Sequence, residues 1–200
     1  LRFDADRALP AFSDAGNLKF GVRMRQRDKS FDDERYRNSS TADFNKLGMQ
    51  INDSFSHSDW EEVYRRLVYW ELELSEAENN MDELLLMQKN EANAAFAKFI
   101  KRNYAKWFED PDNRPLISPD LFKKRIFPLL DQGEKVFVIL IDNFRFDQWR
   151  LIKEILSEFF VFDKEELYYS IRPTATQYAR NAIFSGLMPL QIVQMFPDLW

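Results

Sequence analysis

The sequence contains no cysteine and only five glycines among its 200 residues. Without cysteine the chain can form neither a disulfide framework nor a thiolate metal site, a usage that fits a cytoplasmic protein. The few glycines, together with 45% hydrophobic and 16% aromatic residues, indicate a folded and helix-rich protein. The formal net charge of -5 provides no general attraction to nucleic acid or to anionic membranes.

Long apolar runs are also lacking. The longest unbroken run, from Val136 to Ile141, is far shorter than the roughly 20 residues that cross a bilayer, so no membrane span is expected. The first residues, Leu1 to Asp6, lack the basic start and the apolar centre of a signal peptide. Because the sequence does not begin with methionine, we expect it to be an excerpt of a longer protein.

The chain changes character near residue 40. Residues 1–39 mix charges of both signs with scattered aromatics and show no steady period, so this segment stays unassigned. Residues 40–112 predict a helical domain, in which a capping box at Ser58 and Glu61 begins the second helix. Three apolar runs with spacings of three and four predict a three-helix bundle: Phe44, Leu47, Ile51 and Phe55; Trp60, Val63, Tyr64, Leu67, Trp70 and Leu74; Leu85, Ala92, Phe96, Phe99, Tyr104 and Trp107. Such aromatic stripes are more often core than ligand site.

Turn formers between Asp110 and Pro115 predict a domain boundary after residue 112. Residues 113–200 then follow an α/β pattern. The expected elements are a helix from Ser118 to about Leu130, a buried strand over 136–141, a helix through Trp149 and Phe159, a strand over 167–171 and a helix over 176–184. The order β-α-β-α favours a parallel sheet with helices on its faces, so the predicted fold class is all-α followed by α/β.

Asp142 directly follows the predicted buried strand, where open α/β sheets place their ligand crevices. A carboxylate at this position can bind a divalent metal, although an acid after a strand is also a common turn former or helix cap. Two threonines, Thr174 and Thr176, lie in the turn between the second strand and the next helix. A hydroxyl at a helix start suits anion binding and attack on phosphorus, but threonine is also an ordinary N-cap.

Three stretches of the chain resemble known families. Residues 138–149, VILIDNFRFDQW, resemble the opening strand and turn of PglZ domains, which are a branch of the alkaline phosphatase superfamily. Residues 173–186, PTATQYARNAIFSG, resemble the nucleophile segment of the same domains and follow in the expected order. Upstream, residues 60–104, with LVYWELEL at 67–74, are similar to the helical domain that joins the receiver to the PglZ domain in PorX-type response regulators.

The resemblance implies roles for particular residues. In that superfamily an Asp that ends the first strand is a metal ligand, which corresponds to Asp142. A Thr, Ser or modified Cys at a helix start is the nucleophile, which corresponds to Thr176. Thr176 is preferred to Thr174 because it stands four residues before Arg180, as the nucleophile stands before the comparable Arg in sulfatase-like members. Zinc is the usual metal, so the resemblance implies a zinc ion held by Asp142 and Thr176, with the remaining ligands expected outside this chain.

Other positions are less specific. Arg145 and Asp147 could orient the residues that bind the metal, or simply occupy a surface helix. The single histidine, His57, is expected to be an exposed loop residue of the helical domain. The phosphoacceptor site of a receiver domain is not recognisable in residues 1–40, and much of a PglZ sheet is expected after Trp200, so the resemblance implies a fragment.

The resemblance implies a two-component response regulator whose output is a metal-dependent phosphodiesterase or phosphatase that controls type IX secretion. Implied partners are a sensor histidine kinase, a sigma factor, type IX secretion motor components and a phosphate-ester or nucleotide substrate, with phosphorylation promoting a homodimer. The alternative is a non-catalytic PglZ-fold interaction module that binds a partner such as a sigma factor or a secretion component.

Overall fold

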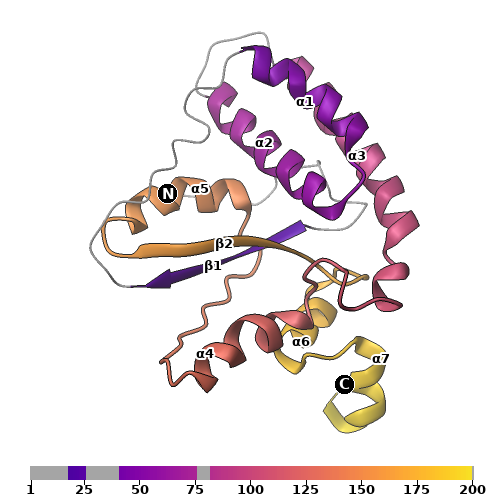
Figure 1. Ribbon diagram of the computed structural model, residues 1–200, viewed down its shortest axis with the longest axis vertical. Coiled ribbons are helices and arrows are strands. Elements are labelled where there is room, and N and C mark those ends of the chain that lie inside the picture. Colours follow the sequence, from indigo (N-terminus) through magenta and orange to yellow (C-terminus); the bar gives the residue numbers. More distant parts are fainter. Residues whose placement is uncertain (1–17, 26–40, 76–81, 200) are drawn as a thin grey trace.

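The computed structural model describes residues 18–25, 41–75 and 82–199, and over these ranges the protein is mixed and mainly helical (Figure 1). None of the helices in these ranges combines the length and the apolar character that a membrane crossing requires. The elements are β1 (Leu18–Arg25), α1 (Thr41–Asp53), α2 (His57–Ser75), α3 (Asp82–Asn103), η2 (Lys106–Phe108), η3 (Phe122–Ile126), α4 (Phe127–Asp131), α5 (Phe146–Leu156), β2 (Val161–Tyr169), α6 (Thr176–Ser185), α7 (Pro189–Met195) and η4 (Pro197–Leu199).

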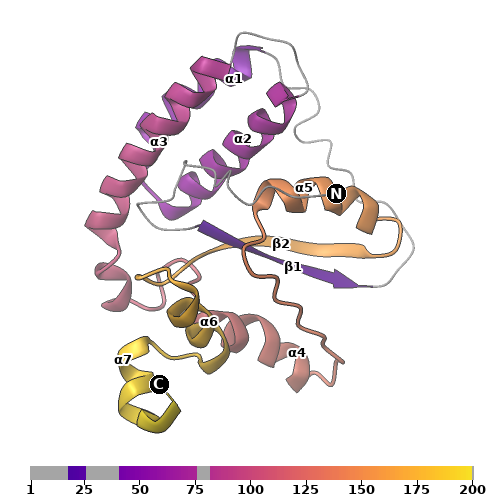
Figure 2. The ribbon, with the colours of Figure 1, turned by 180° about the vertical axis from the view of Figure 1, so that it is seen from behind.

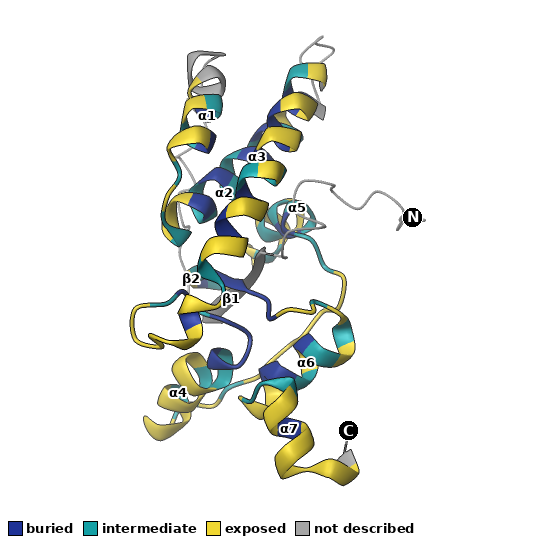
Figure 3. Cartoon of the chain, turned by 90° about the vertical axis from the view of Figure 1, so that its right-hand side faces the viewer, coloured by how far each residue is buried: buried dark blue, intermediate teal, exposed yellow. Residues whose placement is uncertain are grey.

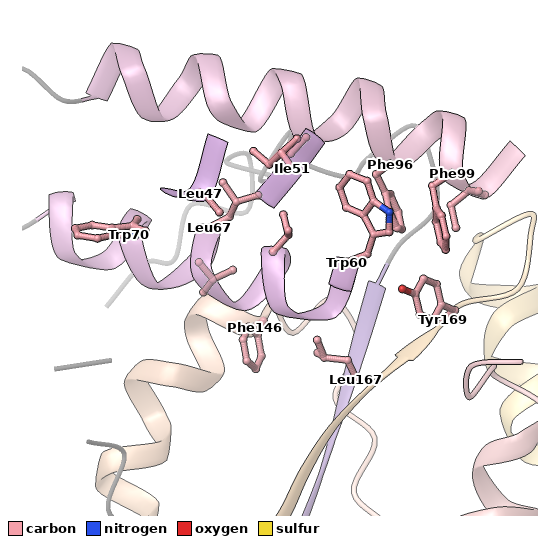
Figure 4. Close-up of a cluster of buried hydrophobic side chains, with 14 of the residues drawn as sticks. Leu47, Ile51, Trp60, Leu67, Trp70, Phe96, Phe99, Phe146, Leu167 and Tyr169 are labelled. Carbon is pink, nitrogen blue, oxygen red and sulfur yellow. The ribbon is translucent and has the colours of Figure 1, made fainter. Parts of the chain in front are cut away.

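Helices α1, α2 and α3 contact one another in pairs and bury large apolar side chains between them (Figure 1). The ring of Trp60 in α2 lies 5.3 Å from that of Phe96 and 6.0 Å from that of Phe99, both in α3 (Figure 4). Phe55 was predicted on the buried stripe but lies beyond the end of α1 and is 80% exposed. The other predicted stripe residues that are confirmed as buried are Leu47, Ile51, Trp60, Val63, Leu67, Trp70, Leu74, Leu85, Ala92, Phe96, Phe99 and Trp107.

Helix α2 begins with a capping box, although not with the predicted residues. The helix starts at His57, so Ser56 is the residue before it. The Ser56 hydroxyl accepts the Asp59 N–H at 3.2 Å, and the Asp59 carboxylate accepts the Ser56 N–H at 2.9 Å. The prediction of Ser58 and Glu61 as the capping pair is wrong, because the sequence offers two overlapping Ser-x-x-acid patterns and only the position where the helix begins selects one.

Ser56→Ala is expected to lower the free energy of unfolding by about 1 kcal/mol, because it removes the acceptor for the Asp59 N–H. The matched control Ser58→Ala should change this free energy by less than about 0.5 kcal/mol. The Ser56 backbone N–H lowers the pKa of the Asp59 carboxyl below its ordinary value of 3.8. The contribution of this carboxylate is therefore present above that pH and is lost as the pH falls through the folded-state pKa.

Urea unfolding of the wild-type, Ser56→Ala, Ser58→Ala and Asp59→Asn proteins, at neutral pH and near pH 3, measures both effects. A larger loss of stability in Ser58→Ala than in Ser56→Ala would contradict the observed capping box. An unchanged difference in stability between wild type and Asp59→Asn, measured at the same two pH values, would contradict the role of the carboxylate.

The sheet among the described residues differs from the predicted one. Strand β2 pairs antiparallel with β1, in a register that runs from Leu18 opposite Tyr169 to Arg25 opposite Val161. Residues 136–141, predicted as a buried strand of a parallel sheet, form no strand and are largely exposed, with Phe137 91% exposed and Ile139 78%. An apolar run becomes a buried strand only where a neighbour supplies backbone hydrogen bonds and cover, and no described strand lies there to do so.

Strand β1 was not anticipated, because residues 1–39 were left unassigned. The overlooked signal is an alternation in which Leu18, Phe20, Val22 and Met24 are separated by single residues that are charged or glycine. Such a period of two is typical of a strand. The second strand was predicted over 167–171 and is observed earlier and longer, as β2.

One core joins the helices to the α/β part of the chain. Phe146, the first residue of α5, is 1% exposed, and its ring stacks 5.7 Å from that of Tyr64 in α2. Tyr169, the last residue of β2, stacks 6.2 Å from Phe96 (Figure 4). The two parts on either side of residue 112 therefore share buried aromatic contacts.

A second, smaller core is formed by Ile171 and by two residues of α6, Ala179 and Ala182. Helix α6 contacts α7. Most residues of α4 and α7 are exposed, in contrast to the buried inner faces of α2 and α3 (Figure 3). Side-chain burial in the described chain is therefore concentrated where the three long helices meet β2 and α5.

Candidate functional site

The carboxyl end of β2 is held by a short segment that precedes α4. The Tyr169 N–H donates to the Leu116 carbonyl at 2.8 Å, and the Ser118 N–H donates to the Tyr169 carbonyl at 3.1 Å. These two bonds form an isolated parallel bridge between Ile117 and Tyr169. The position at which the chain leaves β2 is therefore determined by backbone hydrogen bonds on the edge opposite β1.

The loop after β2, residues 170–175, is anchored at two consecutive amides. The N–H of Ile171, which is fully buried, donates to the Ser118 hydroxyl at 3.2 Å. The next amide, that of Arg172, donates to the Tyr104 hydroxyl at 2.8 Å. Ser118 was predicted to begin a helix, whereas in the structure its hydroxyl accepts a hydrogen bond from this loop. We call residues 170–175 the nucleophile loop below, because they precede Thr176, the residue predicted to be the nucleophile.

Thr176 is the first residue of α6. Ala175 occupies the N-cap position and makes no side-chain capping bond, so neither Thr174 nor Thr176 is the N-cap. Both threonines are half-buried, and Arg180, one turn further along α6, is exposed. The first N–H groups of a helix have no partner within the helix, so the Thr176 hydroxyl lies where an anion is stabilised. The capping alternative for these threonines is therefore not the observed geometry.

Asp142 is exposed and begins a tight turn. Its carboxylate accepts the Asn143 N–H at 3.1 Å, and Asn143 has a left-handed backbone with φ of 56°. The turn-forming alternative is thus observed. The hydrogen bond from Asn143 uses only one of the two Asp142 carboxylate oxygens. The segment before Asp142 runs obliquely to strand β2 (Figure 2). Asp142 and Thr176 each follow the carboxyl end of one of these segments, but no hydrogen bond joins them within the described chain.

Arg145 and Asp147 pair with each other at the start of α5. The Arg145 guanidinium donates to both carboxylate oxygens of Asp147, at 3.0 and 2.7 Å, and this bond raises the pKa of Arg145. The Arg145 backbone N–H donates to the Gln148 side chain at 3.0 Å. The hypothesis that Arg145 and Asp147 support a metal site stays a prediction, while their observed role is to order the start of α5.

The two predicted metal donors do not make a complete metal site by themselves. Among residues 18–25, 41–75 and 82–199, no cluster of three or more His, Cys, Asp or Glu side chains could hold a metal ion. Zinc in proteins takes three or four protein ligands, so Asp142 and Thr176 alone are too few. A complete zinc site therefore requires further ligands besides these two residues.

His57 does not contribute to the site. It was predicted to be an exposed loop residue, but it is the first residue of α2 and is half-buried. Its Nδ1 atom lies 3.8 Å from the Glu61 carboxylate, and its backbone carbonyl accepts the hydroxyl of Tyr169 at 2.8 Å. Burial raises the pKa of Tyr169 above its usual value, so this hydroxyl stays protonated and able to donate.

Comparison with protein families gives two matches, in the order that the resemblance implied. Residues 31–108 match the PorX response regulator linker domain. Residues 121–200 match the BREX system PglZ alkaline phosphatase-like domain. The chain joins a PorX-type linker domain to a PglZ domain. Both predicted site residues, Asp142 and Thr176, lie in the PglZ domain, and this pair of domains is that of a response-regulator-like protein with an alkaline-phosphatase-like output.

No curated protein matches the chain. The PglZ alkaline-phosphatase-like domains are usually metal-dependent, which agrees with the expectation of a metal in the complete site. The linker domain contributes residues next to the PglZ domain that sequence reasoning missed, namely Tyr104 at the nucleophile loop and Tyr64 against α5. Tyr104 was predicted only as a core aromatic, because no sequence signal shows which backbone amide a tyrosine hydroxyl will reach.

Proposed function

We propose that the chain belongs to a two-component response regulator whose PglZ domain is a metal-dependent phosphodiesterase or phosphatase, with Thr176 as the nucleophile. The observation that carries the proposal is the position of Thr176 at the first residue of α6, where it is not the helix cap. A phosphate anion at this helix start meets backbone N–H groups and the positive end of the helix dipole. The match of residues 121–200 to an alkaline phosphatase-like domain supports phosphoryl chemistry at this place.

The chemistry of the proposal is a double displacement. The Thr176 oxygen attacks phosphorus, the bond from phosphorus to the leaving alcohol breaks, and the threonine proton ends on that alcohol. Water then attacks the same phosphorus, releases the phosphate monoester and restores the Thr176 hydroxyl. The chain supplies the nucleophile and its orientation at the helix start, and α6 holds the oxygen in place.

Zinc is the proposed metal. Asp142 and Thr176 supply two of its ligands, and the others come from outside the described residues. When bound, zinc lowers the pKa of a coordinated hydroxyl and stabilises charge on phosphoryl oxygens. Asp142 is exposed, and the hydrogen bond in its turn uses only one of its two carboxylate oxygens. Both features support a role as a metal ligand.

The proposed architecture places a three-helix bundle linker domain over residues 40–112 and the first β-α-β-α part of an alkaline-phosphatase-like parallel sheet over residues 113–200, with residues 1–39 unassigned. The pairwise contacts of α1, α2 and α3 support the bundle. The extended course of residues 136–141 toward Asp142 supports a strand that pairs once a parallel neighbour is present (Figure 1). Such a neighbour covers side chains such as Phe137.

The proposed partners follow from the same architecture. A sensor histidine kinase phosphorylates the regulator, phosphorylation promotes a homodimer, and the output acts in the cytoplasm on a phosphate ester or a nucleotide. A sigma factor and type IX secretion motor components are the proposed downstream partners. The match of residues 31–108 to a response regulator linker domain supports the kinase in general terms.

The exposed apolar segment favours one alternative, a non-catalytic module that binds a protein partner. Residues 136–141 expose Phe137, Val138, Ile139, Leu140 and Ile141 on a stretch that is not paired with any described strand. Contiguous exposed apolar side chains are typical of interaction surfaces. The alternative predicts partner binding without metal and without turnover.

Metal content and hydrolysis of a chromogenic phosphodiester by the full-length protein distinguish the two functions. Wild type is expected to hold zinc and to turn over. Asp142→Ala is expected to weaken zinc binding by at least about tenfold, a loss seen even for residues that only support a ligand. Asp131→Ala removes another exposed carboxylate of the same domain and should behave as wild type. A wild-type protein without metal and without turnover would exclude the enzyme in favour of the binding module.

A further inference from the structure

We propose that Tyr104 of the linker domain is a positioning residue for the nucleophile loop of the PglZ domain. The inference rests on the proposed function of Thr176 and adds a residue from the other domain to that site. Tyr104 follows the last residue of α3, Asn103, and lies in the part of the chain that matches the PorX linker domain. Its hydroxyl accepts the Arg172 N–H at 2.8 Å, across 68 residues of sequence.

The Arg172 amide is a sensitive point of the loop. It is the last backbone donor before Thr174, because the residue between them is Pro173, which has no N–H. The preceding amide, of Ile171, is held by Ser118, which lies in the segment between the two family matches. Of two consecutive amides in the nucleophile loop, one is therefore held from the segment that connects the two family matches and the other from the linker domain.

The Tyr104 ring is itself held by aromatic packing. It meets the Trp107 ring edge-to-face at 5.9 Å and the Phe108 ring at 5.2 Å. Trp107 is buried and meets the ring of Tyr169 edge-to-face at 5.0 Å, and Tyr169 in turn stacks on Phe96 (Figure 4). Edge-to-face pairs at these separations stabilise a defined ring orientation. The Tyr104 hydroxyl is thus connected to the core of the linker domain through rings in mutual contact.

A second connection ties the same end of the linker domain to the other anchor of the loop. The Arg114 guanidinium donates to the Trp107 carbonyl at 3.4 Å and to the Asp120 carboxylate at 2.8 Å. The other oxygen of Asp120 accepts the Ile117 N–H at 3.3 Å, next to Ser118. Both carboxylate and guanidinium are largely buried, so neither can move without leaving a buried charge. The loop anchors at Ile171 and at Arg172 therefore both depend on the region around Trp107.

Only Pro173, Thr174 and Ala175 separate the Arg172 amide from Thr176. A displacement of Arg172 is consequently transmitted to the start of α6 over a short distance. A nucleophile must lie close to its line of attack on phosphorus. Small displacements of Thr176 therefore lower kcat more than they weaken substrate binding. Tyr104 is accordingly expected to control kcat, and a rearrangement of the linker domain that moves Tyr104 changes the output of the PglZ domain.

The test compares two substitutions in the full-length protein. Tyr104→Phe removes the acceptor for the Arg172 amide and keeps the ring. Tyr169→Phe is the matched control, because it removes another hydroxyl bond between the same two domains, that to the His57 carbonyl, and leaves the Arg172 amide alone. Three quantities are measured for each protein: hydrogen exchange resolved at the Arg172 amide, zinc content, and kcat with KM for a chromogenic phosphodiester.

Tyr104→Phe is expected to speed exchange at Arg172 by roughly 2- to 10-fold, the factor of one net hydrogen bond. It is also expected to lower kcat on the order of tenfold, with KM changed less than about twofold and zinc content unchanged. Tyr169→Phe should leave both the exchange at Arg172 and kcat near wild type.

Equal effects of the two substitutions, or faster exchange in Tyr104→Phe with unchanged kcat, would overturn the positioning role. A wild-type protein without turnover would refute the proposed function instead. In that case the exchange at Arg172 alone still decides whether Tyr104 holds the loop, since exchange does not depend on catalysis.

Discussion

Thr176→Ala is expected to lower kcat for phosphodiester hydrolysis by at least about 10³-fold, because it removes the oxygen that attacks phosphorus. The fold should be retained, since Thr176 is only half-buried and does not cap α6. Zinc content is measured in parallel, so that loss of the nucleophile can be separated from loss of the metal. Steady-state kinetics of the full-length protein provide the measurement.

Two matched variants make this result specific. Thr174→Ala removes a hydroxyl from the same loop, and its kcat should stay within about tenfold of wild type, because Thr174 precedes the N-cap of α6. Thr176→Ser keeps a hydroxyl on the same atom of the helix and should retain measurable turnover. If Thr174→Ala is inactive and Thr176→Ala is active, the nucleophile is Thr174 and the assignment of Thr176 is wrong.

Phe96→Ala is expected to lower the free energy of unfolding by about 3 to 5 kcal/mol, which is the range for removing a buried phenylalanine. Phe96 is 1% exposed and contacts Trp60 and Tyr169 on opposite sides of the boundary between the two domains. Truncation leaves a cavity that these large rings cannot fill without losing other contacts. Urea unfolding followed by tryptophan fluorescence and circular dichroism measures the change.

Phe55→Ala removes the same ring from a position that is 80% exposed, and it should change stability by less than about 0.5 kcal/mol. Because Phe96 touches both domains, the two spectroscopic transitions are expected to shift together in Phe96→Ala. A loss below about 1 kcal/mol, or a shift confined to one transition, would contradict a core shared by the linker domain and the PglZ domain.

The sequence predicts a domain boundary after residue 112, but the parts on its two sides share one core. The family matches leave only residues 109–120 between them, and Ile117 and Ser118 in that interval hold the end of β2 and the nucleophile loop. Asp120 and Arg114 form a buried ion pair in the same interval. The connecting segment therefore acts as a structural joint between the domains and not as a flexible linker.

Helical periodicity was sufficient to predict most of the linker domain. Trp60, Leu67 and Phe96 are buried, as the three- and four-residue spacing indicates. The apolar face of an amphipathic helix must be buried, whichever element packs against it. The predicted residues of the capping box were wrong, since Ser56 and Ser58 offer the same pattern and the register of the helix start decides between them. The prediction that Phe55 is buried was wrong for a related reason, because α1 ends before this residue.

The candidate site was predicted only in part. The helix over 176–184 and the second strand are confirmed as α6 and β2, so Thr176 was correctly placed at a helix start. The strand over 136–141 is not observed, because an apolar run indicates burial but not the partner that supplies hydrogen bonds. The assignments of Thr176 as nucleophile and Asp142 as ligand stay predictions that came from the resemblance and not from spacing.

The sequence by itself determined the two families, their order, and the apolar faces of the long helices, because these depend on local residue patterns and spacing. Only the tertiary structure decided that β2 pairs with β1, that Ser118 and Tyr104 hold adjacent amides, and that Phe96 joins two domains. Contacts of this kind link residues far apart in the chain. Each group in such a contact could pair with many chemically equivalent groups elsewhere in the sequence. Their choice depends on how the whole chain packs.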